Sequence, residues 1–66
     1  MLILSRRQEE AIIISGNIRV INLGLNKWGQ VRFGIEAPPN VEVHREEIYW
    51  KIVRGEPYHY TSVIED

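Results

Sequence analysis

The segment APPNVEVHREEIY, residues 37–49, changes its hydrophobic period halfway along. The two adjacent prolines at its start cannot donate to a sheet ladder, so they end any strand that precedes them. Val41 and Val43 then alternate with polar residues, which is typical of a short, half-buried strand. The apolar residues that follow, Ile48 and Ile52, have helical spacing. The segment therefore predicts a strand that passes directly into a helix.

The predicted helix covers about residues 45–54. Glu46 and Glu47 lie in its first turn, where the helix dipole favours negative charge. Gly55 provides the stop signal. Arg45 lies where the strand becomes the helix, and a cation held between two rigid elements is preorganised for binding.

The remainder of the chain up to residue 36 has the alternation of strands, with a hairpin turn at residues 15–17 and a second loop at residues 26–29. Asn22 interrupts the apolar alternation, so either a bulge shifts the register there or both faces are partly covered. The fold expected is mainly β with one short C-terminal helix. Its five strands are predicted at residues 2–7, 11–14, 18–25, 30–36 and 41–44.

The chain is short for its apolar content. It has 66 residues and no cysteine, and twenty residues are Ile, Leu or Val, sixteen of them β-branched. A domain of this size buries only about 60% of the surface of its unfolded chain. Without disulfides or thiolate metal sites, association is the remaining means of stabilisation. We therefore expect an obligate homodimer.

Charge divides the chain into two parts. Residues 1–54 hold all eight Lys and Arg against six acids, a net charge of +2, whereas residues 55–66 carry three acids and no Lys or Arg. We expect one folded domain at residues 1–55, mildly basic and compatible with RNA, and an acidic, tyrosine-containing tail at residues 56–66. No apolar run approaches the ~20 residues of a membrane span. The arginines also follow the short apolar start instead of preceding it, unlike a signal peptide, so we expect a cytoplasmic protein.

The sequence offers little that resembles a catalytic site. Glu46 and Glu47 are adjacent, so on a helix they diverge by roughly 100° and cannot act as a paired acid and base. His44 and Glu47 are two candidate metal ligands, too few for a metal site without cysteine. We expect neither enzyme activity nor a cofactor.

Several blocks of the sequence, in order, resemble the carbon storage regulator family (CsrA, also called RsmA), which are small bacterial RNA-binding translational regulators. The blocks are MLILSRR at residues 1–7, LG at 23–24, QVRFGIEAP at 30–38 and VEVHREEIY at 41–49. The resemblance implies a homodimer with interleaved strands, an intertwined β-sandwich or barrel. It also implies binding of GGA-containing hairpin loops that overlap ribosome-binding sites in mRNA leaders.

In this family the RNA lies between the first strand of one subunit and the fifth strand of the other. The residues that the resemblance implies for this site are Leu4, Ser5, Arg6 and Arg7 from one chain, with Ala37, Pro38, Val41, Val43 and Arg45 from its partner. His44 is expected beside them as a polar strand residue. Binding at the ribosome-binding site would block initiation of translation, and it would also change the stability of the mRNA. Decoy small RNAs with GGA loops would titrate the protein away from its mRNA targets.

The sequence departs from the family at Glu9, where a glycine is usual, so a different local turn is expected. A carboxylate here also lies next to Arg6 and Arg7, two cations that are either a phosphate grip or a solvated strand end. Trp28 either stacks on a base or packs on its own hairpin. The alternative function is a CsrA-like dimeric protein-interaction module with weakened RNA binding, which answers to a protein antagonist.

Overall fold

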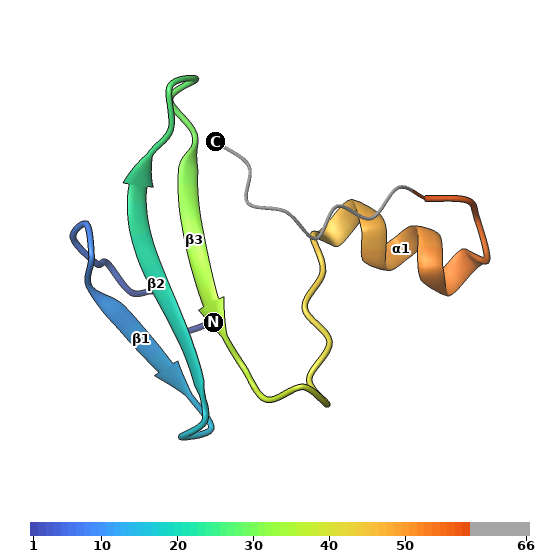
Figure 1. The fold of residues 1–66 in the computed structure, drawn as a ribbon, viewed down its shortest axis with the longest axis horizontal. Coiled ribbons are helices and arrows are strands. Elements are labelled where there is room, and N and C mark those ends of the chain that lie inside the picture. Colours follow the sequence, from blue (N-terminus) through green and yellow to red (C-terminus); the bar gives the residue numbers. More distant parts are fainter. Residues whose placement is uncertain (59–66) are drawn as a thin grey trace.

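The three central strands form an antiparallel meander. In the computed structural model, which describes residues 1–58, β1 (Ala11–Ile14), β2 (Ile18–Leu25) and β3 (Val31–Glu36) pair in chain order (Figure 1). A single helix, α1 (Glu46–Arg54), follows a long connection. The chain is thus mainly β with one short helix, as its periodicity predicted, and these strands and this helix lie within a residue or two of their predicted bounds.

The strand β2 contains the irregularity that Asn22 indicated. Asn22 pairs with Phe33 and Gly24 pairs with Arg32, so the register shifts between Asn22 and Gly24 and confirms the bulge. The Asn22 side chain stabilises it, because its Oδ1 accepts the Gly24 N–H at 2.9 Å. Gly24 has a φ of 85°, a conformation that glycine adopts without steric cost.

The loop between β2 and β3 is ordered around one asparagine. The Oδ1 atom of Asn26 accepts the backbone N–H groups of Trp28 at 2.9 Å and of Gln30 at 3.0 Å. The Trp28 side chain at the tip is 64% exposed, and the Lys27 ammonium lies 4.7 Å from its ring centroid. The indole thus contacts a lysine of its own loop.

The helix α1 begins and ends where the sequence signals predicted. The Arg45 carbonyl accepts the N–H groups of Ile48 at 3.1 Å and Tyr49 at 3.0 Å. Gly55, at a φ of 71°, follows the last turn, and the Glu56 N–H bonds back to the helix. A left-handed glycine with this backbone bond is a common helix stop.

One face of the sheet is apolar and uncovered. Ile12, Val20 and Ile35 are cross-strand neighbours in one row, so they share a face. Phe33 and Val31 lie on the same side of β3, two and four residues from Ile35. We call these five residues the apolar sheet face. Phe33 is 63% exposed and Val31 49%, so this face is not packed within the chain.

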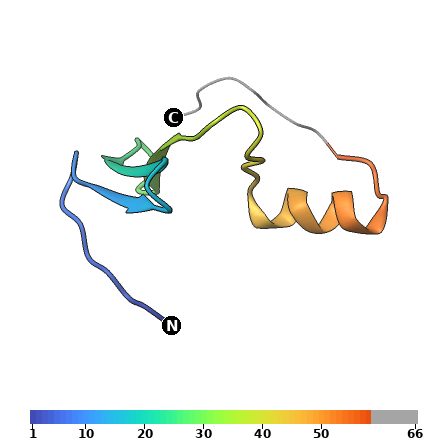
Figure 2. The same ribbon diagram turned by 90° about the horizontal axis from the view of Figure 1, so that it is seen from below.

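Nothing in the described part of the chain closes a core. None of its side chains is fully buried, and α1 makes no contact with the three strands; Figure 2 shows the helix beyond the edge of the sheet. The radius of gyration is 13.5 Å, whereas a compact chain of 66 residues has about 11 Å. A single chain therefore leaves its apolar surface open.

Two of the five predicted strands are not formed in this single chain. Residues 1–7 form an extended arm and residues 37–45 an irregular connection, and neither pairs in a ladder. The alternating pattern is present in both, but a strand needs a neighbour to receive its backbone hydrogen bonds. Most of the predicted acidic tail, residues 59–66, lies outside the described residues. Among the helices of residues 1–58, none has the length and apolarity to span a bilayer.

Candidate functional site

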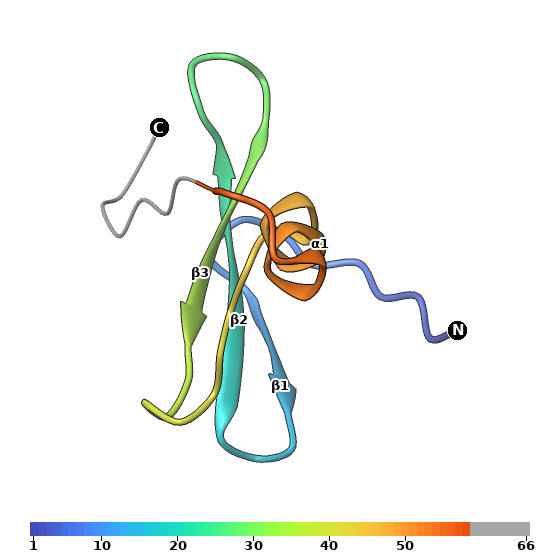
Figure 3. The same cartoon turned by 90° about the vertical axis from the view of Figure 1, so that its right-hand side faces the viewer.

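The first group of predicted site residues lies on the amino-terminal arm. The arm begins away from the sheet, with Leu4 57% exposed (Figure 3), and meets β2 only at its arginine end. There the Arg6 carbonyl accepts the Asn22 Nδ2 amide at 3.0 Å, and the Glu9 N–H donates to the Asn22 carbonyl at 2.5 Å. The backbone of the arm is thus anchored beside Arg6 and Arg7, while Leu4 and Ser5 precede the anchor.

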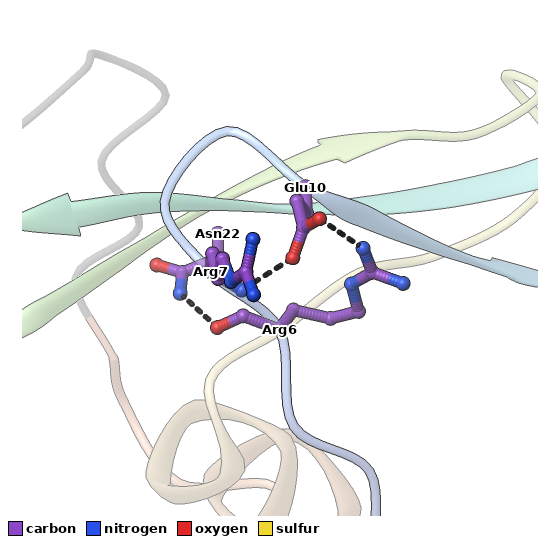
Figure 4. A network of polar contacts seen from close by, with 4 residues as sticks. All are labelled: Arg6, Arg7, Glu10 and Asn22. Carbon is purple, nitrogen blue, oxygen red and sulfur yellow. Dashed lines mark hydrogen bonds and ion pairs between the residues drawn. The ribbon is translucent and has the colours of Figure 1, made fainter.

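A carboxylate organises the two arginines (Figure 4). Glu10 Oε2 lies 2.7 Å from Arg6 Nη2, and Glu10 Oε1 accepts the backbone N–H of Arg7 at 2.7 Å. These contacts hold the pKa of Glu10 below its usual value, the Arg7 N–H having the larger effect and Arg6 the next. Hydrogen bonds to the charged form favour ionisation, so this carboxylate is charged at neutral pH.

The second group lies on the connection between β3 and α1. Ala37 and Pro38 directly follow β3, and the Val41 N–H donates to the Pro38 carbonyl at 3.0 Å, which turns the chain. Val43 is 41% exposed, and His44 Nε2 lies 3.9 Å from a Glu42 carboxylate oxygen. The two valines thus lie on the irregular connection, between the turn at Pro38 and the start of α1.

Arg45 is the residue at which the connection becomes α1. Its backbone is extended, with φ −63° and ψ 150°, and the helix starts at the next residue. Beside it, an open hollow is lined by Glu42, His44, Glu46, Tyr49 and Trp50. Trp50 Nε1 donates to Glu46 Oε2 at 2.9 Å, so the indole is held against the first turn. Arg45 directly precedes the helix, as predicted, but the strand that was expected before it is not formed within residues 1–58.

One chain carries its two groups of site residues on separate segments. The arm and the connection leave the sheet in different directions, as Figures 2 and 3 show. Within residues 1–58, no three His, Asp or Glu side chains gather in a way that would hold a metal ion.

Both segments fall inside a known family. The model of the CsrA global regulator protein family matches residues 1–56. The chain belongs to the CsrA family. That match confirms the resemblance seen in the sequence and includes the arm, the sheet, the connection and α1. CsrA proteins are regulatory RNA-binding proteins and not enzymes, so the prediction that this chain is no enzyme is confirmed by its membership.

Two residues that organise this CsrA chain were not among the predicted site residues. Glu10 binds both arginines, and Asn22 binds the backbone of the arm. Asn22 did carry a signal in the sequence, since a polar side chain that interrupts an apolar strand needs a hydrogen-bond partner. Glu10 carried none, because a charged residue in a turn is normally solvated.

Glu9, where other CsrA members usually have glycine, adopts a φ of 70°. The chain thus keeps a left-handed residue here, at a steric cost of about 1–2 kcal/mol for an L-residue. We expect Glu9→Gly to raise the free energy of unfolding by about 1 kcal/mol, less than the steric cost because glycine loses more entropy on folding. It should also tighten RNA binding, because a negative charge two residues after Arg7 in the sequence is removed.

Ser15→Gly is the matched control, since Ser15 also has a positive φ, of 55°, but lies in the β1–β2 turn. Denaturant unfolding should report stabilisation of both variants, and an RNA titration should report a change in Kd for Glu9→Gly alone. Equal RNA affinities in all three proteins would mean that the Glu9 charge has no influence on the site.

Proposed function

We propose that this CsrA-family chain acts as a homodimeric translational regulator that binds GGA-containing hairpin loops in mRNA leaders. The observation that carries the proposal is the family match over residues 1–56, which spans both arginine-bearing segments. We assign residues 1–55 to the RNA-binding domain and residues 56–66 to an acidic tail. Translation initiates in the cytoplasm, so that is where we propose it acts.

The open apolar surface supports the dimer. The apolar sheet face and much of α1 are exposed in one chain, and burying apolar area contributes roughly 25 cal/mol for each Å² removed from water. Soluble monomers rarely leave such contiguous apolar patches uncovered. A second copy would cover this face with an identical one, which is how two-fold dimers associate.

The sheet edges support interleaving. Within residues 1–58, β1 and β3 are the two edge strands of the sheet, and each pairs in a ladder on one side only. Extended segments add readily to such edges through main-chain hydrogen bonds. In our proposal, the arm and the connection of one subunit pair with edge strands of the other. Each chain then contributes five strands to an intertwined sandwich or barrel.

Interleaving would also complete the RNA site. The first group of site residues from one subunit would lie beside the second group from its partner; the first group is Leu4, Ser5, Arg6 and Arg7. A symmetric dimer would have two such sites. The second group is Ala37, Pro38, Val41, Val43, His44 and Arg45. The arginines would bind RNA phosphates, and the backbone N–H and C=O groups of the strands would hydrogen-bond to the Watson–Crick edges of unpaired bases.

The mechanism that we propose is steric. A dimer bound over a ribosome-binding site excludes the ribosome. Binding to the leader also changes the stability of the mRNA. Small RNAs with several GGA loops would act as decoys. Two linked sites would let one dimer bridge two hairpins in a message, with an avidity set by the spacer between them.

The test is a titration of the purified dimer with a GGA hairpin and with a CCA control hairpin of the same stem. We expect the GGA hairpin to bind more tightly by at least about tenfold, since each wrong base costs about 1–3 kcal/mol. Binding should weaken steeply between low and moderate salt, because several arginines displace counterions. Equal binding of both hairpins would contradict the proposal.

The second candidate is a protein-interaction module with weakened RNA binding. Glu9 favours it, because this residue adds a negative charge two positions after Arg7, next to cations that the RNA site requires. This candidate predicts weak, salt-insensitive RNA binding together with a tight complex with a protein antagonist. The same titration distinguishes the two functions.

A further inference from the structure

We propose that Glu10 is a positioning residue of the RNA site, which acts on RNA affinity through Arg6. The inference rests on the proposed RNA-binding function and adds a residue to it. Glu10 itself need not touch RNA. Its role is to hold the arginine end of the arm in one conformation before RNA arrives.

The first part of the argument is the turn between Arg7 and Glu10. The Glu10 N–H donates to the Arg7 carbonyl at 3.1 Å, and the Arg7 N–H donates to Glu10 Oε1 at 2.7 Å. These two reciprocal bonds close the turn from both ends. Because Glu9 within it has a left-handed φ of 70°, the turn needs such contacts to stay formed.

The second part is the guanidinium of Arg6. Glu10 Oε2 contacts its Nη2 atom at 2.7 Å, with the two side chains 42% and 38% exposed. A guanidinium has five N–H donors, and this ion pair engages Nη2, so donors on Nη1 and Nε remain for a phosphate. In Figure 4 the other terminal nitrogen of Arg6 points away from Glu10. Glu10 can therefore orient Arg6 without blocking it.

The third part is the attachment of this turn to the sheet. Asn22 donates from its Nδ2 to the Arg6 carbonyl at 3.0 Å, and its N–H donates to the Glu10 carbonyl at 3.0 Å. Asn22 is the bulge residue of β2, the central strand. The backbones of Arg6 and Glu10 are thus both hydrogen-bonded to the central strand of the sheet. These bonds fix the position from which the Arg6 side chain extends.

Glu10 has two opposing effects on an RNA phosphate. Its negative charge repels the phosphate, and its contacts reduce the freedom that Arg6 would otherwise lose on binding. We expect the second effect to be larger, because the carboxylate charge is largely compensated by Arg6 itself and the remaining repulsion is screened by water and salt. Ordering a long side chain is a cost that every binding event incurs.

The experiment is a double-mutant cycle with a GGA hairpin, in which Glu10→Gln, Arg6→Ala and the double variant are compared with the wild type. We expect Glu10→Gln to raise Kd by about threefold to tenfold, the effect of freeing one ordered side chain. In the Arg6→Ala background the same change should not weaken binding, because no guanidinium remains for Glu10 to orient and the carboxylate charge is no longer compensated. Glu56→Gln, which removes one acid and an ion pair with Arg54 far from the arm, should leave Kd unchanged.

Two results would overturn the proposal. Tighter RNA binding by Glu10→Gln would make Glu10 a competitor of phosphate, and an equal loss with and without Arg6 would mean that it acts elsewhere. A second measurement needs no RNA: the Glu10 carboxyl, followed by NMR, should titrate below its usual pKa, and Arg6→Gln should raise that pKa. If the wild type does not bind GGA hairpins but its Glu10 titrates at a lowered pKa, the proposed RNA-binding function is wrong and the Arg6–Glu10 contact is correct. If the pKa of Glu10 is ordinary in both the wild type and Arg6→Gln, the Arg6–Glu10 contact is wrong.

Discussion

Arg45→Ala should weaken binding of a GGA hairpin by about tenfold to hundredfold while the dimer stays folded. A hydrogen bond to a charged group contributes about 1.5–3 kcal/mol, and each proposed site contains one Arg45. The helix start does not depend on this side chain, because Arg45 makes no side-chain capping bond and its backbone carbonyl accepts the bonds from Ile48 and Tyr49. Alanine retains that carbonyl.

Lys51→Ala is the control for loss of charge, since Lys51 lies in the last turn of α1 and outside the proposed site. A gel-shift titration at several salt concentrations measures both variants. Arg45→Ala should also lower the salt slope by about one unit if the lost contact is with a phosphate. Wild-type affinity in Arg45→Ala, with circular dichroism showing a folded protein, would contradict the assignment of this residue to the site.

Dilution should unfold this protein. Within residues 1–58 the apolar sheet face is exposed and α1 packs on none of the three strands, so we expect folding to depend on a partner. For such a dimer, the apparent stability falls by about 1.4 kcal/mol for each tenfold dilution, and the melting temperature falls with it. Thermal melts followed by circular dichroism across a wide concentration range would measure this dependence.

Phe33→Ala and Trp28→Ala provide a matched pair for that measurement. The two side chains are 63% and 64% exposed in the single chain, but only Phe33 lies on the apolar sheet face. We expect Phe33→Ala to destabilise the dimer by about 3–5 kcal/mol, as for a buried aromatic, and Trp28→Ala to have little effect. Equal effects of the two changes, or a folded monomer at low concentration by NMR, would argue against an interleaved dimer.

The site was predictable where its position depends on local structure. The Pro-Pro pair predicted the end of β3, and Glu46 and Gly55 predicted the ends of α1. The strand that the alternation at residues 41–44 predicted is not formed within residues 1–58. The family blocks indicated the arginines of the arm. What the sequence could not indicate is how Arg6 is held, because its partner Glu10 was one of several acids near it and only the turn at Glu9 selects it.

The two hairpins and the helix could be predicted from the sequence, because alternation, capping and turn residues act over a few neighbouring positions. Asn22 marked an irregularity in β2, and the structure shows that it is a bulge. The sequence blocks also identified the family. The three-dimensional structure was needed to show that, within residues 1–58, the ladder contains β1, β2 and β3 but neither residues 1–7 nor residues 41–44, and that the apolar sheet face is exposed. It alone also brought Glu10 and Asn22 to Arg6. A paired strand or a packed core forms only when segments distant in the sequence meet. The pattern of one segment does not specify which other segment will pair with it or cover its apolar side chains.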